Sequence, residues 1–324
     1  MSGIAGSTAN SGNEPSEDEL GPADLAGGPP GPSARPGGAI DRSGRLGRLG
    51  AARPPTSRRE VLRDIGSVLS AAAIMPVMSS ADPARRLTDG SAGGDGHGGG
   101  IGSMLVPAYF HPVHAPAAWA TLTDPRLLAV VLNINDGPGD AREPEFVTAV
   151  SAIEAAGGTI TGYVDAGFGA RSVADMETAA RRYRDWYGVA DVFLDQVPAG
   201  AATLETYRTI SGRLRVKGAE FIVFNHGVYP DPGYAAIADL LVTFEGPWPA
   251  YQLMDAPPAW ATALPAWRFC HLVYGAPTGA LDEAVRLAGE RGVGVLYVTD
   301  GQGVNPWNGL PGYFDREVSL VCGG

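Results

Sequence analysis

The sequence predicts an α/β protein whose main domain, from about residue 101 to residue 324, is a parallel (β/α)8 barrel of the TIM type. Two observations favour this fold. Eight short runs of apolar and β-branched residues follow one another, and stretches with apolar residues at helical spacing lie between them. A doubly wound open sheet is the competing architecture. However, no GxGxxG follows the first run, and eight strands are the number that closes such a barrel.

Each of the eight runs has the length of a strand and is apolar almost throughout, as expected for strands that are covered on both faces. They are MLVPAYF (104–110), LLAVVLN (127–133), TITGYV (159–164), ADVFLD (190–195), AEFIVFN (219–225), DLLVTFE (239–245), RFCHLVY (268–274) and VGVLYVT (293–299). Four helices are expected over 143–158, 172–188, 203–218 and 278–292. Each has apolar residues near i, i+3 and i+4 and a glycine close to its end.

The first hundred residues differ sharply in composition from the rest. Residues 1–55 are rich in Gly, Pro, Ala, Ser and Arg. We expect a disordered leader there, because too few large apolar side chains occur to offset the entropy of ordering the chain. Residues 83–100 include GSAGGDGHGGG and are expected to be a flexible linker. The core residues therefore belong to a single domain that follows.

Residues 56–82 have the features of an export signal. SRREVLR, with Arg58 and Arg59 paired, precedes the apolar stretch 65–78 and a run of small residues. This resembles a twin-arginine signal, which implies export by the Tat translocase to the cell envelope or beyond it. The apolar stretch is too short to span a bilayer, so no membrane segment is expected besides the signal. The alternative is an ordinary basic patch before a short amphipathic helix.

The predicted domain is acidic. Residues 101–324 contain 14 Lys and Arg against 24 Asp and Glu, so the domain carries −10 of the chain's formal net charge of −11. Nucleic acid is therefore a poor partner, because phosphate binding needs a basic surface. A neutral or cationic ligand fits better, although acidity that only keeps an exported protein in solution is an equally good explanation.

The chain has two cysteines, Cys270 and Cys322, and no CxxC pair. Their spacing does not suggest metal ligands. A disulfide between them could form outside the cytoplasm, but Cys270 lies in an apolar run, which is typical of a buried thiol.

Polar residues gather where the predicted strands end. In a (β/α)8 barrel, the carboxyl ends of the strands surround the active site. The residues at these ends are His111, Asn133, Asn135, Asp136, Tyr163, Asp165, Asp195, Gln196, Asn225, His226, Glu245, Tyr274 and Asp300. The sequence therefore predicts a polar site at this rim.

Two carboxylates in this set, Asp195 and Glu245, each close a strand whose preceding residues are apolar. Both are expected to face one mouth of the barrel, two strands apart. Glycoside cleavage requires such a pair, because one carboxylic acid protonates the leaving oxygen while the other carboxylate attacks the sugar or activates water. Burial would raise the pKa of one of them and separate their roles. The alternative for each alone is a helix cap or a partner for an arginine.

Several motifs between residues 104 and 250 carry a family resemblance. They are, in order, VPAYFHP, VLNINDGPG, ITGYVDAGFGAR, YGVADVFLDQV, VFNHG and VTFEGP. In this order they resemble the motifs of spherulation-specific family 4, the spherulin-4-like proteins. The resemblance implies a TIM-barrel hydrolase of α-linked N-acetylgalactosamine or galactosamine polymers, related to endo-α-1,4-galactosaminidases, that uses no metal or other cofactor.

The resemblance also implies roles for individual residues. Asp195 would be the nucleophile and Glu245 the acid and base. The groups that would bind or position the sugar are Tyr109, Asn135, Tyr163, Asn225 and His226. The positions of further residues add to this set of substrate-binding candidates His111, Asp136, Gln196, Tyr274 and Trp248, the last of which could stack on a sugar ring.

One departure from the family pattern leaves two other functions open. The family has Asp-Glu where this chain has Asp195-Gln196. Because neighbouring strand residues point to opposite sides, Gln196 is interpreted as a positioning group. If the family's glutamate were the proton donor, the chain would instead be a carbohydrate-binding barrel without turnover. A third hypothesis is a metal-dependent polysaccharide deacetylase that uses His111, His114 and Asp136. The favoured prediction is an exported retaining hydrolase of an amino-sugar polysaccharide.

Overall fold

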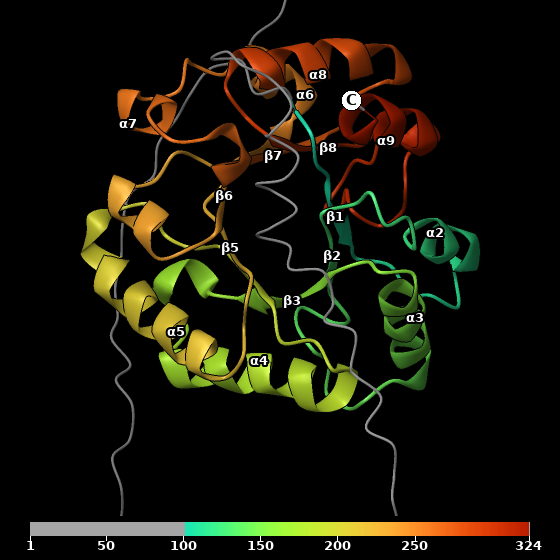
Figure 1. Cartoon of the computed structure of the whole chain (residues 1–324), viewed down its shortest axis with the longest axis vertical. Helices are drawn as coiled ribbons and strands as arrows, with labels where there is room; N and C mark the ends of the chain where they lie inside the picture. Colours follow the sequence, from blue (N-terminus) through green and yellow to red (C-terminus); the bar gives the residue numbers. More distant parts are fainter. Residues whose placement is uncertain (1–100, 324) are drawn as a thin grey trace, which may run out of the picture. The chain divides into compact units, whose positions relative to one another are not determined.

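The computed structural model describes residues 101–323, which contain the predicted barrel (Figure 1). Eight strands lie side by side in chain order, and every neighbouring pair is parallel. They are β1 (Leu105–Ala108), β2 (Ala129–Leu132), β3 (Ile160–Asp165), β4 (Val192–Asp195), β5 (Ile222–Asn225), β6 (Leu240–Pro247), β7 (Phe269–Tyr274) and β8 (Val295–Val298). Each strand lies in one of the eight predicted runs, apart from the last two residues of β6 and the last residue of β3, so the fold prediction is confirmed.

The segment before β1 closes the sheet on itself. Ser103 forms a parallel bridge with Val295 of β8. The N–H of Leu296 donates to the Ser103 carbonyl at 3.0 Å, and the N–H of Gly102 donates to the Gly294 carbonyl at 3.1 Å. These contacts complete the barrel, because they pair the edge of the eighth strand with the start of the first.

Helices surround the strands (Figure 1). They are α2 (Pro116–Thr121), α3 (Pro144–Ala155), α4 (Val173–Tyr187), α5 (Leu204–Val216), α6 (Trp248–Gln252), α7 (Ala259–Thr262), α8 (Leu281–Glu290) and α9 (Phe314–Cys322). Short 3-10 turns occupy Gly167–Gly169, Ala201–Thr203, Pro232–Ala236, Ala266–Arg268 and Thr278–Ala280. The four predicted helices are α3, α4, α5 and α8. Within residues 101–323, no helix combines the length and apolarity needed to cross a membrane.

Helix α4 shows how local sequence fixes an element against the sheet. The Ser172 hydroxyl accepts the Asp175 N–H at 3.1 Å at its start, and Gly188 ends it in the left-handed conformation. Gly162 of β3 faces this helix, and a Cβ there would lie 2.5 Å from the Tyr183 ring. The missing side chain therefore lets α4 approach the barrel closely, and the Tyr183 hydroxyl donates to the Leu132 carbonyl at 2.8 Å.

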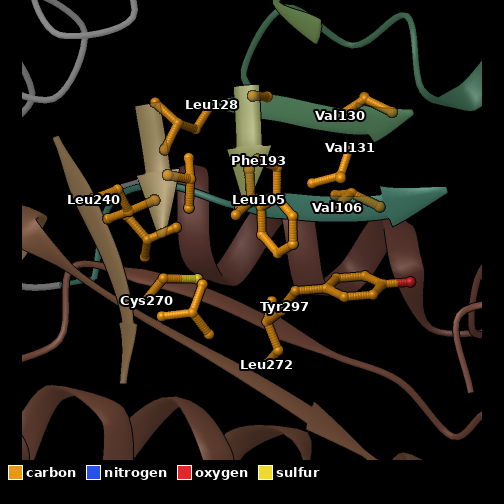
Figure 2. Packing of buried hydrophobic residues seen from close by; sticks show 14 of the residues in the cluster. Leu105, Val106, Leu128, Val130, Val131, Phe193, Leu240, Cys270, Leu272 and Tyr297 are labelled. Atoms are coloured by element: carbon orange, nitrogen blue, oxygen red, sulfur yellow. The ribbon is translucent and has the colours of Figure 1, made fainter. Parts of the chain in front are cut away.

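The inside of the barrel is a packed apolar core (Figure 2). Leu105, Phe193, Leu240 and Leu272 come from four different strands and are at most 1 % exposed. Cys270 is fully buried in the same core, and both it and Cys322 are free thiols. The possible disulfide is therefore not formed, and the buried-thiol interpretation of Cys270 is confirmed.

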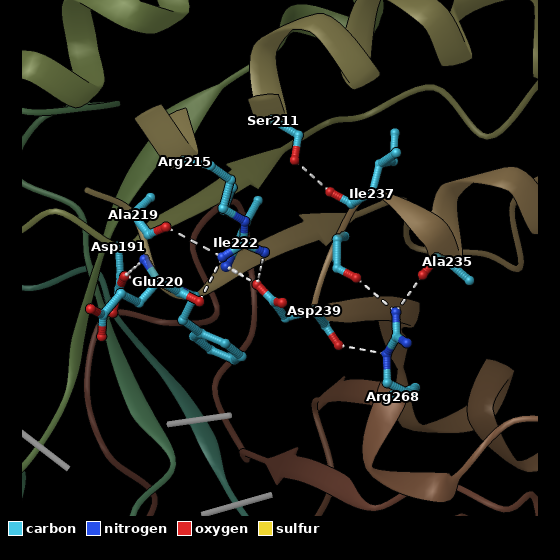
Figure 3. A network of polar contacts seen from close by, with 12 residues as sticks. Asp191, Ser211, Arg215, Ala219, Glu220, Ile222, Ala235, Ile237, Asp239 and Arg268 are labelled. Atoms are coloured by element: carbon cyan, nitrogen blue, oxygen red, sulfur yellow. Dashed lines mark hydrogen bonds and ion pairs between the residues drawn. The ribbon is translucent and has the colours of Figure 1, made fainter. Parts of the chain in front are cut away.

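A polar network lies where strands β5 to β7 begin (Figure 3). The Asp191 carboxylate accepts the N–H groups of Glu220 and Phe221, both at 2.8 Å. Asp239 accepts the Ile222 N–H at 2.6 Å and pairs with the Arg215 guanidinium. These charged groups satisfy main-chain donors at the amino ends of the strands, which is a structural task. A functional site is therefore expected at the carboxyl ends of the strands.

Three regions considered in the sequence, residues 1–55, 56–82 and 83–100, lie outside the described residues. The leader, the twin-arginine signal and the glycine-rich linker therefore stay predictions.

Candidate active site

The site is built around one side-chain amide that contacts both predicted carboxylates. Asn225, the last residue of β5, lies between Asp195 at the end of β4 and Glu245 of β6. Its Nδ2 donates to Asp195 Oδ1 at 2.7 Å and to Glu245 Oε2. Because one nitrogen contacts both, the two acceptor oxygens lie within two hydrogen-bond lengths of each other, at most about 6 Å. The prediction that these two carboxylates lie close together is therefore confirmed.

Two tyrosines stand on the Asp195 side of this pair. The Tyr163 hydroxyl donates to Asp195 Oδ2 at 2.8 Å. Burial and then the Asp195 charge raise the pKa of Tyr163, so its hydroxyl stays protonated and available as a donor. The Tyr109 ring meets Tyr163 edge-on at 5.4 Å between centroids. Burial, then the charges of Asp195 and Glu245, raise the Tyr109 pKa, so this phenol also stays neutral beside them.

Trp307 contacts the second carboxylate oxygen of Glu245, and the sequence analysis did not predict this residue as part of the site. Its indole Nε1 donates to Glu245 Oε1 at 3.3 Å, and the side chain is 4 % exposed. The loop after β8 carries it to this position. There, Tyr109 donates its N–H to the Trp307 carbonyl, and Asn305 bonds both Tyr109 and Trp307, each at 3.1 Å. The only available signal was its place in the last βα loop, which belongs to the active-site rim.

The surroundings of the two carboxyl groups differ. Burial and then the neighbouring Asp195 charge raise the pKa of Glu245 to about 7, against the hydrogen bonds from Asn225 and Trp307. Burial also raises the pKa of Asp195, but three donors oppose it, namely the Tyr163 hydroxyl, the Gln196 N–H and the Asn225 amide. The site therefore favours a proton on Glu245 and a charge on Asp195, which are the two states that acid catalysis beside a nucleophile needs.

Gln196 is placed differently from the sequence prediction. Strand β4 ends at Asp195, and Gln196 has a left-handed φ of 57°. The alternation of side chains along a strand therefore does not apply to it, and that reasoning was wrong. A turn sets the direction of its half-buried side chain instead.

Two predicted histidines bond groups other than the carboxylate pair. His111 bonds Glu143 at 3.2 Å through Nε2 and accepts the Val113 N–H at 3.2 Å. His226 bonds the Val197 carbonyl at 3.0 Å, and its Nε2 is buried without a partner. Burial lowers the pKa of His226 to about 4, so it is neutral. Neither nitrogen of His226 is open to a ligand, and we assign it to holding the loop rather than to sugar binding.

The remaining predicted residues divide into rim and core. Asn135 and Asp136 are exposed in the turn after β2. Tyr274 ends β7, and its ring lies edge-on to Trp307 at 5.9 Å. Trp248 is 7 % exposed and lies beside Tyr251, so the expected stacking surface is covered. It packs at the start of α6 instead.

The residues of the deacetylase hypothesis do not form a ligand set. The rings of His111 and His114 are 5.4 Å apart. Among residues 101–323, however, no group of three His, Cys, Asp or Glu side chains is placed to hold a metal ion. Asp136 therefore does not complete a site with them, and this hypothesis loses its structural basis.

A separate groove of about 340 Å³ lies on the outside of the barrel between α4 and α5. Its lining includes Glu177, Arg181 and Lys217, and it contains none of the predicted site residues. Glu177 is paired with Arg213 at 2.9 Å. The candidate site is therefore the one at the strand ends, where two carboxylates share a donor.

Fold and site together define a TIM-barrel protein with a paired-carboxylate centre at the carboxyl ends of its strands. The chain belongs to spherulation-specific family 4, whose model matches residues 103–321. Spherulin-4 of Physarum polycephalum is 28 % identical over 236 residues, which cover 67 % of this chain and 69 % of that protein. The crystal structure of Aspergillus clavatus Sph3 in complex with GalNAc has a TM-score of 0.60 at 23 % identity. That match covers 69 % of this chain and 98 % of Sph3, and it shows the same fold.

Proposed function

We propose that the protein is a glycoside hydrolase that cleaves an α-linked amino-sugar polysaccharide by a retaining mechanism. The observation that carries this proposal is the single Asn225 nitrogen that bonds both Asp195 and Glu245. Retaining enzymes hold their two carboxyl groups about 5–5.5 Å apart, whereas inverting enzymes leave about 6.5–9.5 Å for a water molecule. A shared donor is compatible with the shorter spacing.

The two carboxyl groups take different roles in this proposal. Asp195, with three donors around it, attacks the anomeric carbon as a carboxylate and forms a glycosyl ester. Glu245, whose pKa is about 7, donates its proton to the departing glycosidic oxygen. It then takes a proton from water, which cleaves the ester and restores Asp195.

An amino-sugar polymer is the substrate class that several observations support. Sph3, which shares the fold, was crystallised with GalNAc. The motifs of the family imply polymers of galactosamine or its N-acetyl form. The formal charge of residues 101–324 is −10, which favours a cationic, partly de-N-acetylated chain.

The decisive experiment measures reducing ends released from α-1,4-linked galactosamine and N-acetylgalactosamine oligomers by the full chain, with a chelator present. Wild type should release them, while Asp195→Asn and Glu245→Gln should not. Glu143→Gln is the matched control, since this carboxylate bonds His111 and lies outside the pair. Loss of activity in Glu143→Gln equal to that in the pair, or full activity in either pair variant, would refute the assignment.

Gln196 supports a second candidate, a carbohydrate-binding barrel without turnover. The family's glutamate is absent here, and Gln196 cannot supply a proton. Oligomer binding measured by calorimetry, with no reducing ends released under any condition in which the protein is folded, would favour this candidate over the hydrolase.

Export is part of the same proposal. The paired Arg58 and Arg59 before the apolar stretch 65–78 support a twin-arginine signal and a location in the cell envelope or outside the cell. Changing both arginines to lysine should keep the protein in the cytoplasm of its host. Unchanged export of that variant would contradict the assignment.

A further inference from the structure

An aromatic side chain stands exposed in one of the loops at the carboxyl ends of the strands. Phe168 lies in the turn Gly167–Gly169 between β3 and α4 and is 76 % exposed. Among the described residues, it is the one aromatic in the set of exposed large hydrophobic side chains. Single exposed apolar side chains are common on protein surfaces, and the backbone and the position of Phe168 distinguish it from them.

The backbone at Phe168 is also unfavourable. Its φ is 51°, in the left-handed region that bulky residues rarely adopt. The flanking residues Gly167 and Gly169 have φ values of 56° and 86°. Glycine at the middle position would relieve the strain, yet a phenylalanine occupies it. Strain of this kind gathers at functional sites, where the surrounding structure maintains it.

The turn that presents Phe168 is fixed by its neighbours. Asp165 Oδ1 accepts the Gly167 N–H at 2.7 Å, and the Ala166 carbonyl accepts the N–H groups of Gly169 and Arg171 at 3.0 and 3.3 Å. A Cβ on Gly169 would lie 3.0 Å from Pro198 Cγ, so the turn lies directly against the chain that follows β4. The ring therefore projects from a held position.

The turn follows the strand that neighbours the one ending in the proposed nucleophile. Asp165 and Asp195 are register partners across β3 and β4, and Phe168 follows Asp165 by three residues. The other exposed apolar residues of the βα loops, Val113 and Val304 among them, are aliphatic and have no ring face. A flat ring at the mouth matches the C–H face of a pyranose, and its π-face also attracts an ammonium group.

We propose that Phe168 is the platform of an outer subsite, on which a sugar ring of the polysaccharide stacks at a distance from the bond being cleaved. This inference rests on the proposed function and narrows its substrate class to oligomers long enough to reach from the carboxylate pair to the β3–α4 turn. Phe168 thus sets a preference for polymer over short fragments, and the bond-breaking step does not involve it.

The test compares KM and kcat of the full chain on α-1,4-linked galactosamine oligomers of increasing length. Phe168→Ala should raise KM for long oligomers by about tenfold, the size of one favourable aromatic contact. The values of kcat, and all constants on the shortest cleaved oligomer, should stay unchanged. Phe168→Tyr should retain the wild-type KM, because it keeps the ring. Phe168→Leu should behave like Ala, because it keeps apolar area without a flat face.

Val216→Ala is the matched control, because Val216 is 84 % exposed at the end of α5, on the amino-terminal side of the barrel. Melting curves of all variants separate a binding defect from misfolding. The inference is wrong if Phe168→Ala and Phe168→Leu have the wild-type KM for long oligomers. An equal rise in KM for short and long substrates would also overturn it.

A binding measurement separates this inference from the proposed function. Titration of the polymer into Glu245→Gln, with and without Phe168→Ala, reports the subsite without any cleavage. Polymer binding that weakens with Phe168→Ala supports the subsite even if wild type proves unable to hydrolyse the chain. Binding that is unchanged by Phe168→Ala, or absent in wild type, refutes it.

Discussion

Replacing Trp307 with Phe removes one hydrogen bond to Glu245 and keeps an aromatic ring in place. The indole Nε1 lies 3.3 Å from Glu245 Oε1, slightly longer than a typical N–H···O hydrogen bond. A hydrogen bond to a charged group contributes about 1.5–3 kcal/mol at good geometry, and at this length we take about 1 kcal/mol. Since one pKa unit corresponds to about 1.36 kcal/mol, the loss should raise the Glu245 pKa by about 0.7 units.

The direction follows from which form the bond stabilises. An N–H donor favours the carboxylate, so its removal favours the protonated acid. If Glu245 is the general acid, the basic limb of the kcat/KM profile falls at its pKa, about 7, and Trp307→Phe should move that limb upward. Trp119→Phe is the control, because that buried indole donates to the Phe110 carbonyl at 3.1 Å. A basic limb that stays in place or moves down would refute the reasoning, as would an equal shift in Trp119→Phe.

Four other predictions follow from the structure. Asn225→Ala should lower kcat/KM by about 100-fold, because the loss of two hydrogen bonds to carboxyl groups amounts to about 3 kcal/mol. A kcat/KM within threefold of wild type would contradict this prediction. Glu317 is fully buried, and burial raises the pKa of its carboxyl group. The folded protein therefore resists the ionisation of Glu317, and the free energy of unfolding falls as pH rises above the pKa of this group in the unfolded chain. Urea unfolding should therefore show Glu317→Gln gaining stability relative to wild type between pH 5 and pH 9, and a relative loss would count against it. Gly162→Ala should destabilise the fold by about 1–3 kcal/mol through its clash with Tyr183. Gly212→Ala, where a Cβ meets nothing within 4 Å, should stabilise α5 by about 0.5–1 kcal/mol, and calorimetric melting checks both signs.

The strands could be predicted because their burial is uniform. All four residues of β1, β2, β5 and β8 are buried, which produces the continuous apolar runs seen in the sequence. Helices were predictable where they are long. The predicted α3, α4, α5 and α8 have 10 to 15 residues, whereas α2, α6, α7 and α9 have 4 to 9. One or two turns are too few for a helical period to stand out.

The carboxylate pair could be predicted for a geometric reason, and its supporting residues could not. Asp195 and Glu245 close parallel strands, so their shared edge follows from topology alone. Trp307 reaches Glu245 from 62 residues away through a loop whose course depends on contacts with Tyr109. His226 also lies at the rim, yet its ring packs on Tyr234 at 4.6 Å between centroids. Beyond a strand end, neighbours rather than the alternation of side chains decide where a side chain points.

The amide of Asn225 has a consequence for how charge moves in the proposed reaction. Before attack, Asp195 is anionic and Glu245 neutral, whereas in the glycosyl-enzyme Asp195 is an uncharged ester and Glu245 is anionic. The total of the pair stays at one negative charge, and the charge changes sides. Asn225 directs one N–H to each side, so the stronger, charge-assisted bond passes from one hydrogen to the other while the nitrogen stays in place. The site therefore offers the migrating charge a donor at both ends of its path, with no reorientation of the protein between the two half-reactions.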